Sequence, residues 1–227
     1  MGRNNIFLRQ QPMRLSSPIQ GPHCSPLTGE GSRKGDLNIV CSSTPGWPTA
    51  ATKASLPSSR KNHKTKPMTI ILATWNVRTL LDAQDGTERP RRRTALIAHE
   101  LKRYNIDIVA LSEMRFSGED SLTEVGEGHT FFWRGLPENE RRLHGVGFAV
   151  KSRLLSNIPE SPQGISERLM IWRIPLVKGR FATLISAYAP TLGADENIKD
   201  AFYESLDAAL SKIPDSDKLV LMGDFNA

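Results

Sequence analysis

The chain has 227 residues, a formal net charge of +6 and a sequence pI near 9.5, values that on their own favour a nucleic-acid partner. Residues 1–67 contain ten Lys and Arg and two acids, whereas residues 68–227 contain 20 basic and 22 acidic residues, so net charge gives no argument that the second part binds nucleic acid. No apolar run approaches the roughly 20 residues that cross a bilayer, and the chain start lacks a secretory signal, which excludes membrane-spanning and secreted classes.

Residues 1–67 are rich in Pro, Ser, Gly and basic residues, with no apolar run longer than three residues. Such a composition buries too little surface to offset the entropy of ordering, so a disordered basic tail is predicted, with a folded domain over 68–227. Cys24 and Cys41 lie in this tail without metal-ligand spacing and are interpreted as reduced thiols of an intracellular protein. The basic cluster Arg60–Lys66 is either a nuclear-import or phosphate-contacting patch or a solvated linker, and a nuclear rather than cytoplasmic location is expected.

From Met68 the sequence changes to short apolar runs separated by turn residues, which is typical of a folded chain of helices and strands. Residues 68–77 are predicted to form a first strand, residues 94–107 a helix, and residues 107–113 a second strand. The helix is expected to bury a stripe made of Leu96, Ile97, Leu101 and Tyr104. His99 is assigned to its solvent-facing side.

The next part of the chain predicts four strands, over residues 129–135, 144–152, 168–176 and 179–190, each bounded by Gly, Pro or Asn. A second helix is predicted over 201–213, with Phe202, Leu206, Ala209 and Leu210 on one side. A last strand is predicted over 217–227. Helices and strands are mixed rather than strictly alternating, which favours an α+β sandwich over a Rossmann sheet.

Four predicted strands are apolar for about five residues and then end in polar side chains: Asn76, Glu113, Tyr188, and Asp224 with Asn226. If the same end of each strand faces solvent, these groups converge on one edge of the sandwich, as an oxygen-liganded metal site requires. Each residue taken alone also has a structural interpretation. Asn and Asp at strand ends are common turn residues or helix caps, and a Tyr there is commonly a half-buried core residue.

The segments TWNVRT (74–79), ALSEMR (110–115), SAYAPT (186–191) and GDFNA (223–227) resemble, in order and approximate spacing, the motifs of the endonuclease/exonuclease/phosphatase superfamily. The sequence between these motifs is similar to that of the endonucleases of LINE-type retrotransposons, in particular those of the RTE type. This resemblance implies a partial four-layer α/β/β/α sandwich and a Mg²⁺-dependent DNA endonuclease, with DNA as the partner and Mn²⁺ as a substitute metal.

The resemblance also implies roles for the strand-end residues. Glu113 is the principal Mg²⁺ ligand and Asn76 lies beside the metal. Tyr188 hydrogen-bonds the scissile phosphate, Asp224 orients or deprotonates the attacking water, and Asn226 donates to a nonbridging oxygen.

Three further residues near the motifs are candidates for contacting phosphate. Thr191 stands where many relatives have Asn, and Arg115 and Arg168 carry guanidinium groups that pair with phosphate. For both arginines a structural or surface ion pair is the preferred alternative. His144 is interpreted as a loop residue.

The superfamily's sequence continues past GDFNA to an Asp and a catalytic His that have no counterpart here, so a C-terminally truncated domain with impaired catalysis is expected. Loss of one such group costs roughly a hundredfold to a thousandfold in rate. Whether the chain is an enzyme therefore stays open. The alternatives are a catalytically inactive, retrotransposon-derived binding protein and a small-molecule phosphatase of the same superfamily.

Overall fold

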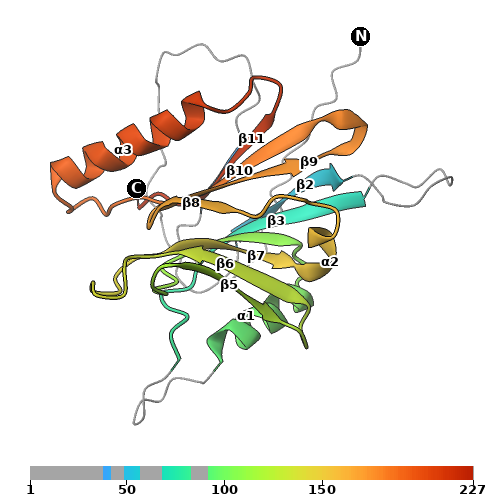
Figure 1. The fold of residues 1–227 in the computed structure, drawn as a ribbon, viewed down its shortest axis with the longest axis horizontal. Helices are drawn as coiled ribbons and strands as arrows, with labels where there is room; N and C mark the ends of the chain where they lie inside the picture. The colour runs from blue at the N-terminus through green and yellow to red at the C-terminus, as the bar shows by residue number, and fades with distance from the viewer. Residues whose placement is uncertain (1–37, 42–48, 57–67, 83–91, 227) are drawn as a thin grey trace, which may run out of the picture.

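The structure is a computed structural model that describes residues 38–41, 49–56, 68–82 and 92–226 (Figure 1). Its strands are β1 (Asn38–Cys41), β2 (Thr49–Leu56), β3 (Met68–Asn76), β4 (Ile108–Ser112), β5 (Glu119–Glu124), β6 (His129–Arg134), β7 (Val146–Lys151), β8 (Gln163–Ser166), β9 (Leu169–Pro175), β10 (Phe181–Tyr188) and β11 (Lys218–Asp224). Its helices are α1 (Arg93–Arg103), α2 (Ser152–Leu155) and α3 (Glu196–Ser211), with a 3₁₀ turn, η1, at Val177–Gly179.

The strands form two mixed sheets that pack face to face. One has the order β1-β11-β10-β9-β8 and the other β2-β3-β4-β7-β6-β5. Helix α3 covers the outer face of the first sheet and α1 the outer face of the second (Figure 1). The predicted four-layer α/β/β/α sandwich is confirmed.

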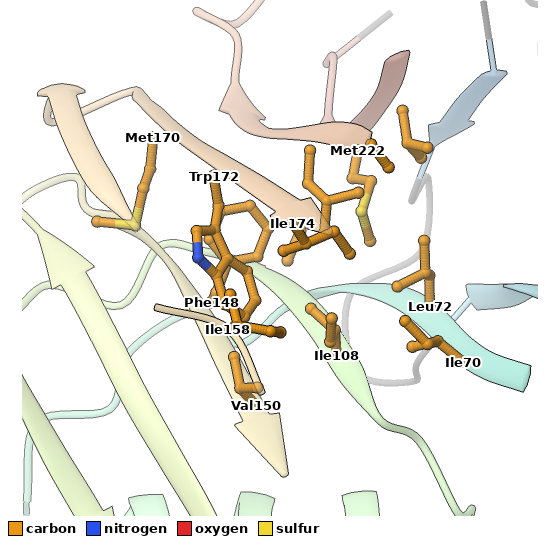
Figure 2. Close-up of a cluster of buried hydrophobic side chains, with 14 of the residues drawn as sticks. Ile70, Leu72, Ile108, Phe148, Val150, Ile158, Met170, Trp172, Ile174 and Met222 are labelled. Atoms are coloured by element: carbon orange, nitrogen blue, oxygen red, sulfur yellow. The ribbon is translucent and has the colours of Figure 1, made fainter. Parts of the chain in front are cut away.

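The core between the sheets is built from the inward-facing residues of alternating strand positions (Figure 2). Trp172 of β9 and Phe148 of β7 meet across the two sheets with ring centroids 6.0 Å apart. The Trp172 indole N–H donates to the Glu160 carbonyl at 2.6 Å, so its one polar atom is satisfied. Burying each such side chain contributes about 1.5–3 kcal/mol, which makes this layer the main support of the sandwich.

Of the stripe predicted for helix α1, Leu101 is buried and Ile97 and Tyr104 are partly buried against the same core, whereas Leu96 is misplaced. The buried residues of the helix are Thr94, Ala98 and Leu101, spaced at i, i+4 and i+7, while Leu96 is 48% exposed. Two residues along a helix turn the side chain by about 200°. A stripe centred on Ala98 therefore points Leu96 to solvent, and small Ala98 lets the helix approach the sheet closely. His99 is exposed, as expected, and lies 3.5 Å from a carboxylate oxygen of Glu127.

Helix α3 begins at Glu196, five residues before its predicted start. The Asp195 side chain accepts a hydrogen bond from Asn197 N at 2.9 Å and caps the helix. The residues around Asp195 are mostly polar, so the sequence analysis did not identify it as the N-cap. Phe202, Leu206 and Ala209 are buried against the sheet, in agreement with the predicted apolar side.

Four strands were not predicted. β5 and β8 are largely exposed and polar, so neither carries an apolar pattern. β1 and β2 lie within the segment predicted to be disordered, and that expectation is wrong for these two stretches: β1 pairs parallel with β11 and β2 antiparallel with β3. Backbone pairing needs no long run of apolar side chains, so the overall composition of residues 1–67 did not predict these strands. The other residues of 1–67, with Cys24 and the Arg60–Lys66 cluster, lie outside the described residues, and the domain boundary at Met68 stays a prediction.

Two parallel crossovers determine where the polar strand ends lie. β3 pairs parallel with β4 after α1, with Asn76 opposite Ser112, and β10 pairs parallel with β11 after α3, with Tyr188 opposite Asp224. In a parallel pair both carboxyl ends lie at one edge of the sheet, where open sheets ordinarily bind ligands. In the described part of the chain, no helix has the length and apolar character needed to span a membrane.

Candidate active site

The side chain of Asn76, at the end of β3, joins two carboxylates from opposite sheets. Its amide nitrogen lies 2.7 Å from Glu113 Oε1 and 2.8 Å from Asp224 Oδ2. Asn76 is 5% exposed, so the amide is held in a fixed position. Its Oδ1 accepts a hydrogen bond from Arg78 N at 3.0 Å, which fixes which end of the amide faces the acids. Two carboxylate oxygens thus lie within 2.8 Å of one nitrogen.

The loops around this amide hold several residues in left-handed backbone conformations. Of the seven non-glycine residues with positive φ in the described part of the chain, four follow these strand ends: Arg78, Glu113, Arg115 and Asn226. Such a conformation costs an L-residue roughly 1–2 kcal/mol. Strained residues that gather in one place commonly mark a functional site, because packing must hold them there.

Gly223 lets β10 and β11 approach closely next to Asp224. Its φ is +142°, and a Cβ at this position would lie 1.8 Å from the Ala187 carbonyl oxygen. Any side chain here would push the two strands apart. The Gly in GDFN is therefore required to bring Asp224 to the level of Tyr188 on the neighbouring strand.

Tyr188 is 8% exposed, and its phenol is subject to the negative charge of the nearby Glu113 carboxylate. Burial, and then the negative charge of Glu113, raise the pKa of Tyr188 to about 12, although nearby Arg168 acts in the opposite direction. The phenol is therefore protonated throughout the physiological range and can donate a hydrogen bond to an anion.

Asp224 and Asn226 are arranged by the turn after β11. Asp224 Oδ1 accepts from Asn226 N at 3.1 Å, which leaves Oδ2 for Asn76. The Asn226 amide donates to the Ala189 carbonyl at 2.6 Å and so closes this turn onto the end of β10. Both side chains are half-buried.

Of the three candidates for phosphate contacts, Arg115 and Thr191 have different environments. Arg115 forms an ion pair with Glu113 at 3.2 Å, and its Nε is buried without a hydrogen-bond partner. Thr191 is exposed in the turn after β10, and among the described residues no hydrogen bond or ion pair joins its side chain to Asn76, Glu113 or Asp224. The structure thus brings Arg115 to the site and leaves Thr191 apart from it.

The third phosphate candidate, Arg168, and the loop residue His144 lie directly beside Tyr188. The Arg168 guanidinium donates from Nη1 to the Tyr188 carbonyl at 3.2 Å, and from Nη2 it reaches the His144 ring, 3.1 Å from Nε2. The rings of His144 and Tyr188 have centroids 6.0 Å apart. One sequence feature could have predicted this contact. If the two neighbouring strands pair antiparallel, as β9 and β10 do, Arg168 just before β9 lies next to Tyr188 at the end of β10.

The donor set suits a hard divalent cation that keeps much of its water. Mg²⁺ is commonly bound by one or two carboxylates plus water, and Glu113 and Asp224 supply such carboxylates, while the Asn76 amide nitrogen holds both in place. Among the described residues, no cluster of three or more His, Cys, Asp or Glu side chains is arranged to hold a metal, so a fully protein-liganded site such as structural zinc requires is not found there. Chemically, the edge combines two acids, a protonated phenol, two amides and nearby guanidinium groups.

The chain is similar to several known proteins. The model of the Endonuclease/Exonuclease/phosphatase family matches residues 73–227. Craniofacial development protein 2 of Bos taurus is 29% identical over 160 residues, which cover 69% of this chain and 24% of that protein. Its counterpart in Tragulus javanicus is 29% identical over 156 residues, covering 69% and 25%. The chain therefore spans about a quarter of the length of these relatives. A solved AP endonuclease structure from Archaeoglobus fulgidus aligns with 67% of this chain and 56% of that chain, at a TM-score of 0.43 and 19% identity.

Proposed function

The chain belongs to the endonuclease/exonuclease/phosphatase family, and from this we propose that residues 68–227 form a Mg²⁺-dependent phosphodiesterase domain that nicks DNA, as retrotransposon endonucleases do. Membership of this family supports a hydrolytic activity of the nuclease or phosphatase type. DNA as substrate, Mg²⁺ as metal, retrotransposon origin and a nuclear location are the finer parts of the proposal.

The observation that carries the proposal is the double hydrogen bond from the Asn76 amide to Glu113 and Asp224. Two carboxylates this close repel each other, and a neutral amide offsets only part of that repulsion. A divalent cation would offset the rest, so the arrangement favours metal binding. The adjoining phenol and guanidinium groups then favour an anionic substrate over a neutral one.

Each residue of the site has a distinct part in the proposed hydrolysis. Glu113 holds Mg²⁺, with Asn76 fixing its carboxylate. Asp224 accepts a proton from, or orients, the attacking water. Tyr188 and Asn226 donate hydrogen bonds to phosphate oxygens as negative charge builds up on them.

The physical requirement behind these roles is that a phosphodiester repels hydroxide. Bound Mg²⁺ would supply positive charge for the phosphate and the departing oxygen. The protein's own groups must orient the attacking water on the side of the phosphorus opposite the departing oxygen, and prevent attack from other directions. Their mutual hydrogen bonds hold them in place before substrate arrives, which lowers the cost of reorganisation during the reaction.

A nicking assay on supercoiled plasmid tests the proposal. The chain should relax the plasmid with Mg²⁺ or Mn²⁺ and not with EDTA, and both Glu113→Gln and Asp224→Asn should reduce the rate at least about a hundredfold. Nicking that survives both changes would contradict the proposal. A rate far below that of a full-length relative under the same conditions would support the expectation of impaired catalysis. No metal-dependent nicking by folded protein would favour the alternative of a non-catalytic binding protein.

A further inference from the structure

Arg168 carries a buried positive charge whose one carboxylate partner is distant and makes no hydrogen bond to it. Its side chain is 13% exposed, which is low for an arginine. Among the described residues, the one carboxylate within 4.0 Å is that of Glu167, 3.8 Å from Nε and joined by no hydrogen bond. Its hydrogen bonds go instead to a backbone carbonyl and to an imidazole.

Other arginines of the domain differ in this respect. Arg173, Arg92, Arg134 and Arg115 each place a guanidinium nitrogen within 3.2 Å of a carboxylate oxygen. A buried cation is costly unless it is paired, so proteins ordinarily supply an acid. Arg168 is more buried than these four, and its nearest carboxylate is farther away.

The contact with His144 directs the guanidinium. An arginine can only donate hydrogen bonds, so the ring nitrogen facing Nη2 must be an acceptor and the imidazole is neutral. Burial and then the charge of Arg168 lower the pKa of His144, in agreement with this state. The His144 carbonyl also accepts a hydrogen bond from Arg115 N at 2.9 Å, which links the loop holding the imidazole to the loop that follows Glu113.

The charge is located beside the candidate active site. The Arg168 guanidinium lies 5.2 Å from the centroid of the Tyr188 ring, and Tyr188 N donates to the Arg168 carbonyl at 2.9 Å. An anion bound against Tyr188 would therefore meet Arg168 at the same time.

We propose that Arg168 forms an anion subsite next to the metal site, with His144 as its positioning residue, and that the subsite takes a phosphate group of a nucleic-acid strand. Guanidinium matches phosphate in bidentate geometry, and a phosphate would supply a closer, hydrogen-bonded negative charge than Glu167, which lies 3.8 Å away. The identity of the ligand as a phosphodiester rests on the proposed function, whereas the anion subsite itself rests on the burial and contacts of Arg168.

The test is DNA binding without metal, measured by fluorescence anisotropy of a short labelled duplex in EDTA at several salt concentrations. Each phosphate neutralised contributes about −0.9 to the slope of log K against log salt concentration. Arg168→Gln should make the slope shallower by about that amount and weaken binding at low salt by roughly tenfold to a hundredfold. Arg153→Gln is the matched control, since it removes the same charge from an exposed position on α2. Helix α2 follows the end of β7, whereas His144 precedes its start.

His144→Ala should weaken binding and leave the slope unchanged, because it removes the positioning contact and no charge. If Arg168→Gln does not fold, Arg168→Lys takes its place and should keep the slope while weakening binding several-fold, since an ammonium lacks the fork geometry. An unchanged slope in Arg168→Gln, an equal change in Arg153→Gln, unaltered binding in Arg168→Lys, or no binding at the lowest salt concentration would each overturn the subsite. Because EDTA prevents metal-dependent hydrolysis, failure here is distinct from failure of the nicking assay.

Discussion

The amide nitrogen of Asn76 lies 2.8 Å from a carboxylate oxygen of Asp224, although the two residues belong to different sheets and stand 148 positions apart in the chain. This contact ties the ends of β3 and β11 together across the sandwich. The same nitrogen also holds Glu113, so the neutral amide stands between two acids. Its replacement by an acid is therefore a direct probe of the local charge.

Asn76→Asp should lower the free energy of unfolding of the metal-free protein by about 2–4 kcal/mol, since it places a third carboxylate about 4 Å from two others. Mg²⁺ at about one hundred times its dissociation constant should return roughly 2.7 kcal/mol. Denaturant unfolding with and without Mg²⁺ measures both effects. Asn157→Asp, beyond α2 at the far end of the sandwich, serves as control: it should show no such loss, and Mg²⁺ should stabilise it as much as it stabilises the parent protein. Equal losses in the two variants would contradict the proposed role of Asn76.

Tyr188 should be the last tyrosine to ionise. Burial and the charge of Glu113 raise the pKa of Tyr188 to about 12, and the chain contains three tyrosines. A folded-state pKa above the ordinary value of 10.0 means that the neutral phenol contributes stability below pH 10, and that this contribution disappears as the pH rises towards 12. Absorbance titration of phenolate should show a late component that Tyr188→Phe removes. A component that ionises near pH 10 in the folded protein and disappears in Tyr188→Phe would show that the phenol is not buried against Glu113.

Arg168→Gln should raise the pKa of His144. Burial lowers this pKa first and the Arg168 charge second, so the variant removes the second cause and leaves the first. Because the folded-state pKa lies below the ordinary 6.5, neutral His144 contributes stability above pH 6.5, and that contribution is lost as the pH falls. Proton NMR titration of the imidazole measures the pKa, with Arg153→Gln as the control. A His144 resonance that titrates identically in Arg168→Gln and the parent protein would rule out their contact.

Asp217 tests folding independently of the site. Its carboxylate accepts from Arg173 Nε at 2.6 Å and from Thr183 Oγ1 at 3.0 Å, and its side chain is 1% exposed. Asp217→Ala leaves the buried Thr183 hydroxyl unpaired and should lower the free energy of unfolding by about 2–4 kcal/mol. Exposed Asp215→Ala is the matched control.

The pH dependence provides a second check on Asp217. The hydrogen bond from Arg173 is the main cause that lowers the pKa of Asp217 below 3.8. The stability it contributes is therefore present above pH 3.8 and lost as the pH falls further, so the parent protein and Asp217→Ala should become alike in strong acid. A difference between the two that is constant with pH would mean that the charge is not involved.

The sequence predicted those parts of the fold that apolar patterning encodes. Strands β3, β4, β6, β7, β9, β10 and β11 agree with the predicted runs to within a few residues, and the two long helices are present. β5 was missed because five of its six residues are exposed, so the backbone ladder to β6, rather than burial, holds it in place. Leu96 was misplaced because hydrophobicity alone did not show that Ala98 would face the sheet.

The candidate site was predicted to a similar extent. Polar residues at the ends of apolar strands marked Asn76, Glu113, Tyr188 and Asp224, and parallel pairing brings such ends together. Arg168 was assigned to an ion pair, and the structure gives it one with Glu167 at 3.8 Å, but its hydrogen bonds to His144 and to the Tyr188 carbonyl were not predicted. Its place beside Tyr188 depends on antiparallel strand pairing in three dimensions.

The most direct test of the central claim is a Mn²⁺ titration monitored by electron paramagnetic resonance, which counts free ions as bound ones lose their signal. The full chain should bind one Mn²⁺ that Mg²⁺ displaces, Glu113→Gln should weaken binding at least about tenfold, and Asp120→Asn on exposed β5 should leave it unchanged. A parent protein that binds no Mn²⁺, or a Glu113→Gln variant that binds it as tightly as the parent, would contradict a divalent-cation site formed by these strand ends.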